Sequence, residues 1–403
     1  IHPTAAYHFP SCDYAANLFT LSEPGYIYTR LHNPTTAAYE ERITALYDGV
    51  GALAVASGMS AILLTVTALA NAGQNIVASP YLYGGTHNQF VISLRNVGIE
   101  CRLAKSDSPE DMAALVDENT RALFVESMGN PTCRVADIEA LAEVAHSNNI
   151  PLIVDNTFGA GGYLCNPFEW GADIVTGSTQ RLGTPMGFGG PHAGYMTTRE
   201  AYKRNMPGRI IGVSVDRLGN KALRMALQMR EQHIKRERAT SNICTAQALM
   251  ASMVGFYCIY NGKEGLQRAA MVAHSAAVTV KEALEAMGYK VRTQALFDTL
   301  EVEAEASVIQ DIALAREINM YYPTDDTVRM SFDEVTTDEE LQAIVEIFAE
   351  ARGKKAKAVK RVEAAAIAAE VKRESDFFTE AIFNSYRTET EMMRYIKRLE
   401  LRD

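Results

Sequence analysis

Two turns hold the residue types that could do chemistry in this chain, and each follows an apolar run typical of a buried strand. The first run, residues 150–154, is followed directly by a carboxylate, Asp155. The second run, residues 172–175, leads into a turn that is rich in hydroxyl groups and ends in Arg181. Because ligands of an open α/β sheet bind at the carboxyl ends of its strands, we expect both turns to border one site.

A carboxylate at such a strand end can hold a protonated ring nitrogen, which is the task that an Asp performs for pyridoxal phosphate (PLP). The second turn is then where the lysine that forms a Schiff base with PLP is expected, and Arg181 stands there. An arginine stays protonated at ordinary pH and cannot form that bond. We therefore predict PLP as the cofactor, bound without a covalent link.

Three further strand ends offer groups for the same ligand. Gly58 opens a predicted helix, whose free N–H groups and dipole favour an anion. Tyr83 could stack on a flat ring, and Asn130 could contact a ring oxygen. The alternative interpretations are a plain strand–helix turn, an aromatic residue at the edge of the core, and a simple loop.

Strand patterns alternate with helical patterns up to Val175, which predicts βαβ units and a mainly parallel sheet. Strands are expected at 52–56, 75–79, 101–104, 122–126, 150–154, 172–175, 299–302 and 328–332. Helices are expected at 36–47, 59–70, 86–96, 109–116, 137–147, 244–260, 264–287, 307–318 and 338–351.

These elements predict a large domain followed by smaller parts. The expected divisions are an N-terminal arm (1–35), a large domain (36–260), a connecting helix (261–288), a small α+β domain (289–352), and a helical linker with a docking tail (353–403). The linker is predicted as a solvated helix because Ala, Lys and Glu dominate residues 354–373. The tail, 375–403, is too apolar to remain free and is expected to dock on another surface.

Composition excludes several classes of function. The chain has 403 residues and a net charge of −10, which argues against nucleic acid or an anionic membrane as the main partner. No apolar run approaches the roughly 20 residues of a membrane helix. Six scattered Cys predict reduced thiols and a cytoplasmic protein, and dispersed His residues give no support for a metal site.

Six motifs occur in order over residues 1–175. They are Tyr28-Thr29-Arg30 with Asn33-Pro34-Thr35, Ala56-Ser57-Gly58-Met59, Tyr83-Gly84-Gly85-Thr86, Asn130-Pro131, Val154-Asp155-Asn156-Thr157-Phe158 and Gly171-Ala172-Asp173. Together they resemble the Cys/Met-metabolism family of fold-type-I PLP enzymes, and within it the O-acetylhomoserine sulfhydrylases. The resemblance implies an aspartate aminotransferase-like α/β fold.

The same resemblance implies roles for single residues. Tyr28 and Arg30 would reach the phosphate of the neighbouring subunit, which implies a homodimer, and Tyr83 would stack on the ring. The implied cofactor-binding residues are Tyr28, Arg30, Gly58, Met59, Tyr83, Asn130, Asp155, Thr157 and Ser178. Arg181 and Tyr83 are the candidate catalytic residues. Arg329 lies where this family binds the substrate carboxylate, although a solvated edge-strand arginine is an equal alternative.

From residue 176 the chain is similar to a second family. The motifs are Gly177-Ser178-Thr179-Gln180-Arg181, Pro185-Met186-Gly187-Phe188-Gly189-Gly190-Pro191-His192, Met206-Pro207-Gly208-Arg209, Ala239-Thr240-Ser241-Asn242 and Phe383-Asn384-Ser385-Tyr386. They resemble the N-terminal half of the P-protein (glycine decarboxylase) of the glycine cleavage system. That half has the PLP fold without the Schiff-base lysine, which belongs to a second half.

The chain is therefore interpreted as a composite of two related families, and three functions follow. The first is a lysine-lacking P-protein half that supports a lysine-bearing half and the lipoyl carrier protein. The second is an O-acetylhomoserine sulfhydrylase or lyase. The third is a non-catalytic assembly or scaffold protein that keeps only the fold.

Overall fold

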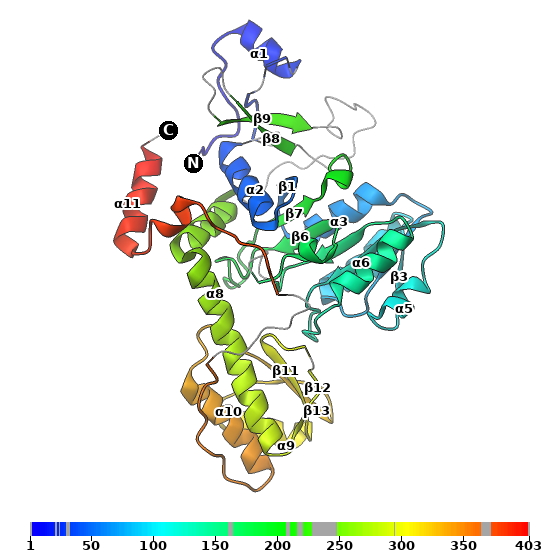
Figure 1. Ribbon diagram of the computed structural model, residues 1–403, viewed down its shortest axis with the longest axis vertical. Helices are drawn as coiled ribbons and strands as arrows, with labels where there is room; N and C mark the ends of the chain where they lie inside the picture. Colours follow the sequence, from blue (N-terminus) through cyan, green and yellow to red (C-terminus); the bar gives the residue numbers. More distant parts are fainter. Residues whose placement is uncertain are drawn as a thin grey trace. The chain divides into compact units, whose positions relative to one another are not determined.

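The computed structural model describes residues 2–20, 22–23, 25–29, 33–159, 164–206, 210–215, 221–227, 248–293, 295–363 and 372–401. The chain forms two compact units, and each is considered by itself (Figure 1). Unit 1 comprises residues 1–127, 137–263 and 373–403. Unit 2 comprises residues 128–136 and 264–372.

Unit 1 is built on a seven-stranded sheet with the order β1-β7-β6-β5-β4-β2-β3. Its strands are β1 (Gly51–Val55), β2 (Asn75–Ala78), β3 (Glu100–Leu103), β4 (Thr120–Glu126), β5 (Leu152–Asp155), β6 (Ile174–Ser178) and β7 (Gly194–Thr198). The pairs among β2 to β6 are parallel, and β7 runs antiparallel to both β6 and β1. The predicted mainly parallel α/β fold is confirmed.

Helices lie between these strands in the chain and also before and after them. In unit 1 they are α1 (Cys12–Phe19), α2 (Pro34–Tyr47), α3 (Gly58–Leu69), α4 (Gly84–Asn88), η1 (Gln89–Leu94), α5 (Pro109–Ala113), α6 (Ile138–Ser147), η3 (Pro167–Trp170), η4 (Glu200–Tyr202), η6 (Ala381–Asn384) and α11 (Glu389–Glu400). The helix predicted over 86–96 is divided, because its later part adopts the wider π form as η1.

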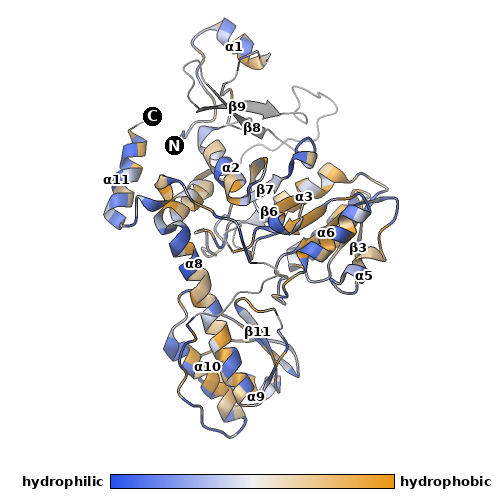
Figure 2. Ribbon diagram, viewed as in Figure 1, coloured by the Kyte–Doolittle hydropathy of each residue, from blue (hydrophilic) through white to orange (hydrophobic). Residues whose placement is uncertain are grey.

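The core of unit 1 forms where helices pack on the central strands. Ile62 and Val66 of α3 belong to one buried cluster with Ile153 of β5 and Ile174 of β6. Strands such as β1 and β5 are buried on both faces, which explains their continuous apolar runs. Figure 2 shows α3 as largely apolar, whereas α6 carries both apolar and polar residues. A separate hairpin, β8 (Ile210–Val215) with β9 (Lys221–Leu227), is antiparallel.

Unit 2 contains a four-stranded antiparallel sheet with the order β10-β11-β13-β12. Its elements are β10 (Lys290–Val291), β11 (Thr299–Glu303), α9 (Ala306–Ala315), β12 (Tyr321–Thr324), β13 (Thr327–Ser331), α10 (Asp338–Ala351) and the later part of α8 (Ala248–Ala286). Leu284, Leu300, Val328 and Phe348 share its buried core. The predicted small α+β domain is present, with its helices lying against the sheet (Figure 1).

Residues 128–136 fall in unit 2, although the expected large domain contained them. The reason is a direct link to the small sheet, because Arg329 Nη1 donates to the carbonyl oxygen of Pro131 at 2.9 Å. Helix α8 also joins two expected parts into one element, interrupted only at Gly262. Gly262 has φ +59, and Arg387 packs against it.

The helix predicted for the linker is wrong over residues 354–363, which form no helix. Side chains of α10 hold this stretch in another conformation. Gln342 Oε1 accepts a hydrogen bond from the N–H of Val359 at 2.8 Å, and Asp338 Oδ1 accepts one from Arg361 Nε at 2.7 Å. These bonds attach the stretch to α10 in a non-helical conformation.

The tail docks on unit 1 of its own chain. Arg373 is buried and donates to the carbonyl oxygens of Leu46, Ser375 and Asp376. Glu169 accepts from the N–H of Glu374 at 2.7 Å. Further along, the rings of Phe378 and Phe383 stack with centroids 4.1 Å apart, and both are buried. Among the described residues, no helix is long and apolar enough to cross a membrane.

Candidate functional site

Asp155 ends β5 as a buried carboxylate whose two oxygens differ. Its Oδ1 accepts two hydrogen bonds from Thr157, one from the N–H at 2.8 Å and one from the hydroxyl at 2.6 Å. Its Oδ2 has no hydrogen-bond partner among the described residues. Burial raises the pKa of Asp155 to about 6, and the two bonds from Thr157 oppose that rise. The free oxygen is therefore available to a ligand that brings a proton or a positive charge.

The second predicted turn lies beside it, at the end of β6. The N–H of Ser178 donates to the hydroxyl of Thr157 at 2.9 Å, so Thr157 joins the ends of β5 and β6. Gly58 packs directly against this turn, because a Cβ added at Gly58 would lie 3.1 Å from Ser178 Cβ and 3.2 Å from Ser178 N. A side chain at residue 58 would fill the space between the two segments.

The N-terminus of α3 is arranged for an anion. Ser57 caps the helix by accepting from the N–H of Ser60 at 3.1 Å. The N–H groups of Gly58 and Met59 have no partner within the helix. Since Ser178 lies against Gly58 and its hydroxyl accepts from Gln180 at 3.3 Å, its own proton can be donated to the same anion. Backbone donors and the helix dipole then act together.

Tyr83 lies at the neighbouring strand ends. Its N–H donates to Glu126 Oε1 at 2.7 Å, and Glu126 is paired in register with Asp155. The Tyr83 side chain is 50% exposed, and its hydroxyl makes no hydrogen bond among the described residues. A ring that is placed by its backbone and open on its surface suits stacking on a ligand.

Gln89 is a neighbour of this site that the sequence did not single out. Its Nε2 donates to the carbonyl oxygen of Met59 at 3.2 Å, and its Oε1 is buried without a partner. The hydroxyl of Thr86 also lies 3.7 Å from the sulfur of Met59. Helix α4 and η1 thus fasten the start of α3, a relation that only the folded chain reveals.

Arg181 follows the same β6 turn. Its guanidinium carbon lies 4.7 Å from the centre of the Phe158 ring, so it stacks on the loop that follows Asp155. The turn is anchored from within by Thr179, whose N–H donates to the carbonyl oxygen of Ala193 at 3.0 Å and whose hydroxyl pairs with Thr184 at 2.8 Å. The position expected for a lysine therefore presents a fixed positive charge.

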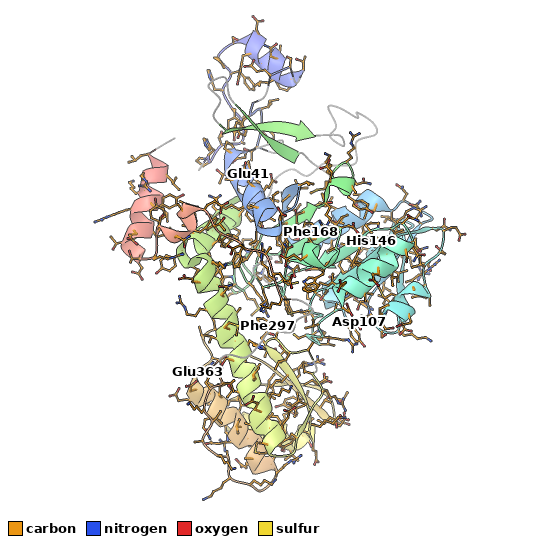
Figure 3. All side chains as sticks on the ribbon, viewed as in Figure 1. Glu41, Asp107, His146, Phe168, Phe297 and Glu363 are labelled. Carbon is orange, nitrogen blue, oxygen red and sulfur yellow. The ribbon has the colours of Figure 1, made fainter. Side chains whose placement is uncertain are left out.

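A buried polar layer lies behind this site. The hydroxyls of Tyr47 and Tyr195 are 2.6 Å apart, and Asn156 Nδ2 donates to Tyr47 at 3.0 Å. Asn156 Oδ1 accepts from the hydroxyl of Ser127 at 2.8 Å. Phe168, labelled in Figure 3, packs edge-on against Tyr47. Burial raises the pKa of Tyr47 well above its ordinary value, so the layer is neutral.

Three other predicted site residues are not among the groups described so far. Tyr28 pairs with Ala6 in the N-terminal segment, and no hydrogen bond among the described residues links it to Asp155 or Ser178. Arg30 lies outside the described residues. Asn130 belongs to unit 2.

Arg329 also belongs to unit 2 and is buried there. Its Nε donates to Glu301 Oε2 at 3.1 Å, its Nη1 contacts the carbonyl oxygen of Pro131, and its guanidinium lies 5.5 Å from the Tyr321 ring. The interpretation as a solvated edge-strand arginine is wrong, because Glu301 and Tyr321 enclose it. A substrate carboxylate would compete with Glu301 for this guanidinium.

Within unit 1 the arrangement combines a carboxylate with a free oxygen, an exposed aromatic ring and a helix N-terminus at one edge of a sheet. These groups fit the ring nitrogen, ring face and phosphate of PLP. No group of three or more metal-binding side chains occurs among the described residues. Such a site on a mainly parallel sheet defines the fold-type-I class of PLP enzymes.

Solved structures support this class. A putative O-acetylhomoserine (thiol)-lyase from Campylobacter jejuni, which carries a pyridoxyl-lysine phosphate, aligns with a TM-score of 0.67 over 86% of this chain and 94% of its own, at 24% identity. Glycine decarboxylase (P-protein) of the glycine cleavage system, in an inhibitor-bound form, aligns with a TM-score of 0.65 over 79% and 75%, at 26% identity. The first likeness concerns the fold alone.

The sequence defines the family more closely. The family model of the glycine cleavage system P-protein matches residues 42–348, and the chain belongs to this family. The match runs across the expected boundary at residues 175 and 176.

A glycine dehydrogenase (decarboxylating) from Bacteroides fragilis is 47% identical over 78% of this chain and 33% of its own length. One from Christiangramia forsetii is 49% identical over 59% and 25%. The chain thus spans about a quarter to a third of the curated relatives that it matches.

Proposed function

We propose that this chain binds PLP without a covalent link and acts as a lysine-lacking part of a glycine decarboxylase of the P-protein type. The observation that carries the proposal is the pair formed by Asp155 and Arg181. Asp155 keeps one oxygen without a partner among the described residues, and Arg181 stands where the sulfhydrylase-like family has its Schiff-base lysine. The first feature supports binding of the cofactor, and the second excludes its covalent attachment by this residue.

Each site residue has a defined task in this proposal. Asp155 Oδ2 pairs with the ring nitrogen, and Tyr83 covers one face of the ring. The N–H groups of Gly58 and Met59 and the hydroxyl of Ser178 bind the phosphate. Thr157, expected as a direct cofactor contact, holds Asp155 instead. When bound, PLP supplies an electron sink for negative charge at the α-carbon of an amino acid.

Arg181 limits what the chain does alone. A lysine at that position would move protons at the substrate as well as form the covalent link, and arginine does neither. We therefore propose that decarboxylation of glycine, the activity for which the curated relatives are named, requires a lysine-bearing P-protein part. The lipoyl carrier protein of the glycine cleavage system is the proposed acceptor partner.

Four further points remain proposals: a homodimer, the role of Arg329, the cellular location and the origin of the chain. A homodimer would let Tyr28 and Arg30 serve the neighbouring phosphate, and Arg329 would bind the substrate carboxylate in exchange for Glu301. A cytoplasmic location agrees with the composition of the chain.

A composite origin is supported by the sulfhydrylase-like motifs before residue 176. Comparing separate family trees for residues 42–175 and 176–348 would test it. The sulfhydrylase activity itself is supported by the fold alone.

The deciding experiment is a PLP titration followed by borohydride reduction and mass spectrometry. The wild-type chain should bind PLP reversibly and carry no adduct after reduction. Arg181→Lys should carry one adduct at residue 181, because the other groups already frame the ring. An adduct on the wild-type chain at another lysine near Asp155, or no binding at all, would overturn the proposal.

A further inference from the structure

The hydroxyl of Thr157 lies between the two ends of the proposed site. It accepts a hydrogen bond from the N–H of Ser178 at 2.9 Å and donates one to Asp155 Oδ1 at 2.6 Å. The direction is fixed, because the Ser178 amide is only a donor and the hydroxyl then has its proton left for the carboxylate. One side chain therefore links the phosphate end to the ring-nitrogen end.

This geometry determines where Asp155 can carry a proton. Oδ1 already accepts from both the N–H and the hydroxyl of Thr157. A proton on that oxygen would face two donors, so the exchangeable proton of Asp155 belongs on Oδ2. Oδ2 is the oxygen that has no partner among the described residues, and it is the one left for a ligand.

We infer that Thr157 is a positioning residue which, through its hydroxyl, orients Asp155 and favours its carboxylate form opposite the ring nitrogen of the cofactor. The inference builds on the proposed function, since it concerns the same PLP site. It assigns Thr157 a role different from direct contact with the cofactor, because both of its hydrogen-bonding directions are already used within the chain.

Four other titratable or charged groups lie around Asp155 and influence how its carboxyl group titrates. Glu126 on β4 is its register partner, Tyr47 of α2 and Tyr195 of β7 lie in the polar layer behind it, and Arg181 stacks on the following loop. Substitution of Thr157 leaves all four unchanged. A change in the titration of Asp155 would therefore report the loss of the hydroxyl.

Thr176 provides a matched control. It is the register partner of Asp155 on β6 and is fully buried, yet within the described parts of the chain its hydroxyl has no hydrogen-bond partner. Thr176→Val thus removes the same atom, by the same isosteric change, beside the same carboxylate. It should leave the titration of Asp155 and the binding of PLP unchanged.

The test measures the dissociation constant of PLP from pH 5 to 9 in the wild type, Thr157→Val, Thr157→Ser and Thr176→Val. In Thr157→Val, the pH at which PLP binding is lost on acidification should rise by about one unit. Below that pH, PLP should bind about tenfold more weakly than it binds to the wild type. Thr157→Ser and Thr176→Val should match the wild type. An unchanged midpoint in Thr157→Val, or an equal shift in Thr176→Val, would overturn the inference.

A second measurement separates this inference from the proposed function. Carbon NMR of the ligand-free protein, with the signal assigned by Asp155→Asn, follows the carboxyl directly, and its midpoint should rise in Thr157→Val. If the wild type fails to bind PLP, the proposed function fails and this titration still decides the role of Thr157. If Thr157→Val does not fold, Thr157→Cys keeps the volume with a weaker donor and should shift the midpoint in the same direction; no shift would contradict the inference.

Discussion

Two buried aspartates lie at opposite ends of the neighbouring strands β5 and β6. They differ in their hydrogen-bond and charge partners. Asp155 ends β5 at the carboxyl edge, and Asp173 precedes β6 at the amino edge. The exposed fractions are nearly equal, 8% for Asp155 and 9% for Asp173. Burial alone therefore does not distinguish a ligand-binding carboxylate from a structural one.

Their partners do distinguish them. Asp173 Oδ2 accepts from the N–H of Leu152 at 2.9 Å and lies 2.9 Å from Nε2 of His146, which is labelled in Figure 3. Asp155 contacts no cationic side chain among the described residues, and its pKa rises to about 6. A buried carboxylate without a counter-charge costs folding free energy unless a ligand supplies the charge. The comparison therefore supports the proposed role of Asp155 in binding a ligand and indicates a structural role for Asp173.

The largest expected effect is that of Asp155→Asn on PLP binding. Loss of the charge that faces the ring nitrogen should weaken binding by about 100-fold or more, since breaking a buried ion pair costs about 3–5 kcal/mol. A fluorescence titration measures the dissociation constant. Unchanged affinity would break the comparison between the two aspartates.

The same substitution should stabilise the ligand-free protein. The folded-state pKa of Asp155 lies above its ordinary value of 3.8, at about 6. The resulting penalty is absent below pH 3.8, grows as the pH rises through this window, and is complete above about pH 6. Asparagine does not ionise, so at pH 8 Asp155→Asn should unfold at higher urea concentration than the wild type.

Glu40 shows that a raised pKa alone does not mark a site. It is a buried residue of α2, and its Oε1 accepts from the N–H of Ala54 in the edge strand β1 at 2.8 Å. Burial raises its pKa from 4.5 to about 8. Its penalty therefore increases between pH 4.5 and pH 8 by at most about 1.4 kcal/mol per pH unit.

Glu40→Gln should remove that slope and leave PLP binding unchanged. Urea unfolding at pH 5, 6, 7 and 8 measures the difference between variant and wild type, which should grow with pH. An exposed substitution on α6, Glu139→Gln, controls for the loss of one negative charge. A difference independent of pH would show that Glu40 is not protonated in the fold.

A smaller effect is expected from Asp173→Ala. The substitution leaves the buried N–H of Leu152 without its acceptor and removes the contact with His146, at a cost of about 1–3 kcal/mol in unfolding free energy. Asp173→Asn keeps an acceptor and should lose less. PLP affinity should stay within about twofold, provided that the variant is folded at the temperature of the titration. A large loss of affinity in the folded variant would contradict the assignment of Asp173 to the fold.

Much of the site could be predicted because strand ends in a parallel sheet meet at one edge. That rule alone brings Gly58, Asp155 and Ser178 together, and the structure places them so. It also placed Arg181 at the expected turn.

The remainder depends on contacts that no local pattern encodes. The bond from Ser178 to Thr157, the approach of Gln89 to Met59 and the enclosure of Arg329 by Glu301 all join residues that are distant in the sequence. The composition of the linker favours a helix, but over residues 354–363 its hydrogen bonds to α10 hold it in a non-helical conformation. Tertiary contacts outweigh propensities of a few tenths of a kcal/mol per residue.

The smallest expected effect is that of substitutions at Glu126. They test whether the ligand-binding edge of the sheet includes the end of the neighbouring strand β4 as well as Asp155. Glu126 accepts from the N–H of Tyr83 and thereby places a ring whose hydroxyl makes no hydrogen bond among the described residues. Glu126→Ala should weaken PLP binding about fivefold, since one such hydrogen bond contributes about 1 kcal/mol. Glu126→Gln keeps an acceptor and should bind within about twofold of the wild type.

A double-mutant cycle separates this positioning from an electrostatic effect on Asp155. If Glu126 acts through Tyr83, then Glu126→Ala should cost little once Tyr83→Ala has removed the ring, and the two effects should not add. If instead the negative charge of Glu126 opposes ionisation of Asp155, both Gln and Ala at residue 126 should strengthen binding, with or without Tyr83. Stronger binding in both variants would mean that Glu126 acts only as a neighbouring charge. The ligand-binding edge would then consist of Asp155 and its own loop.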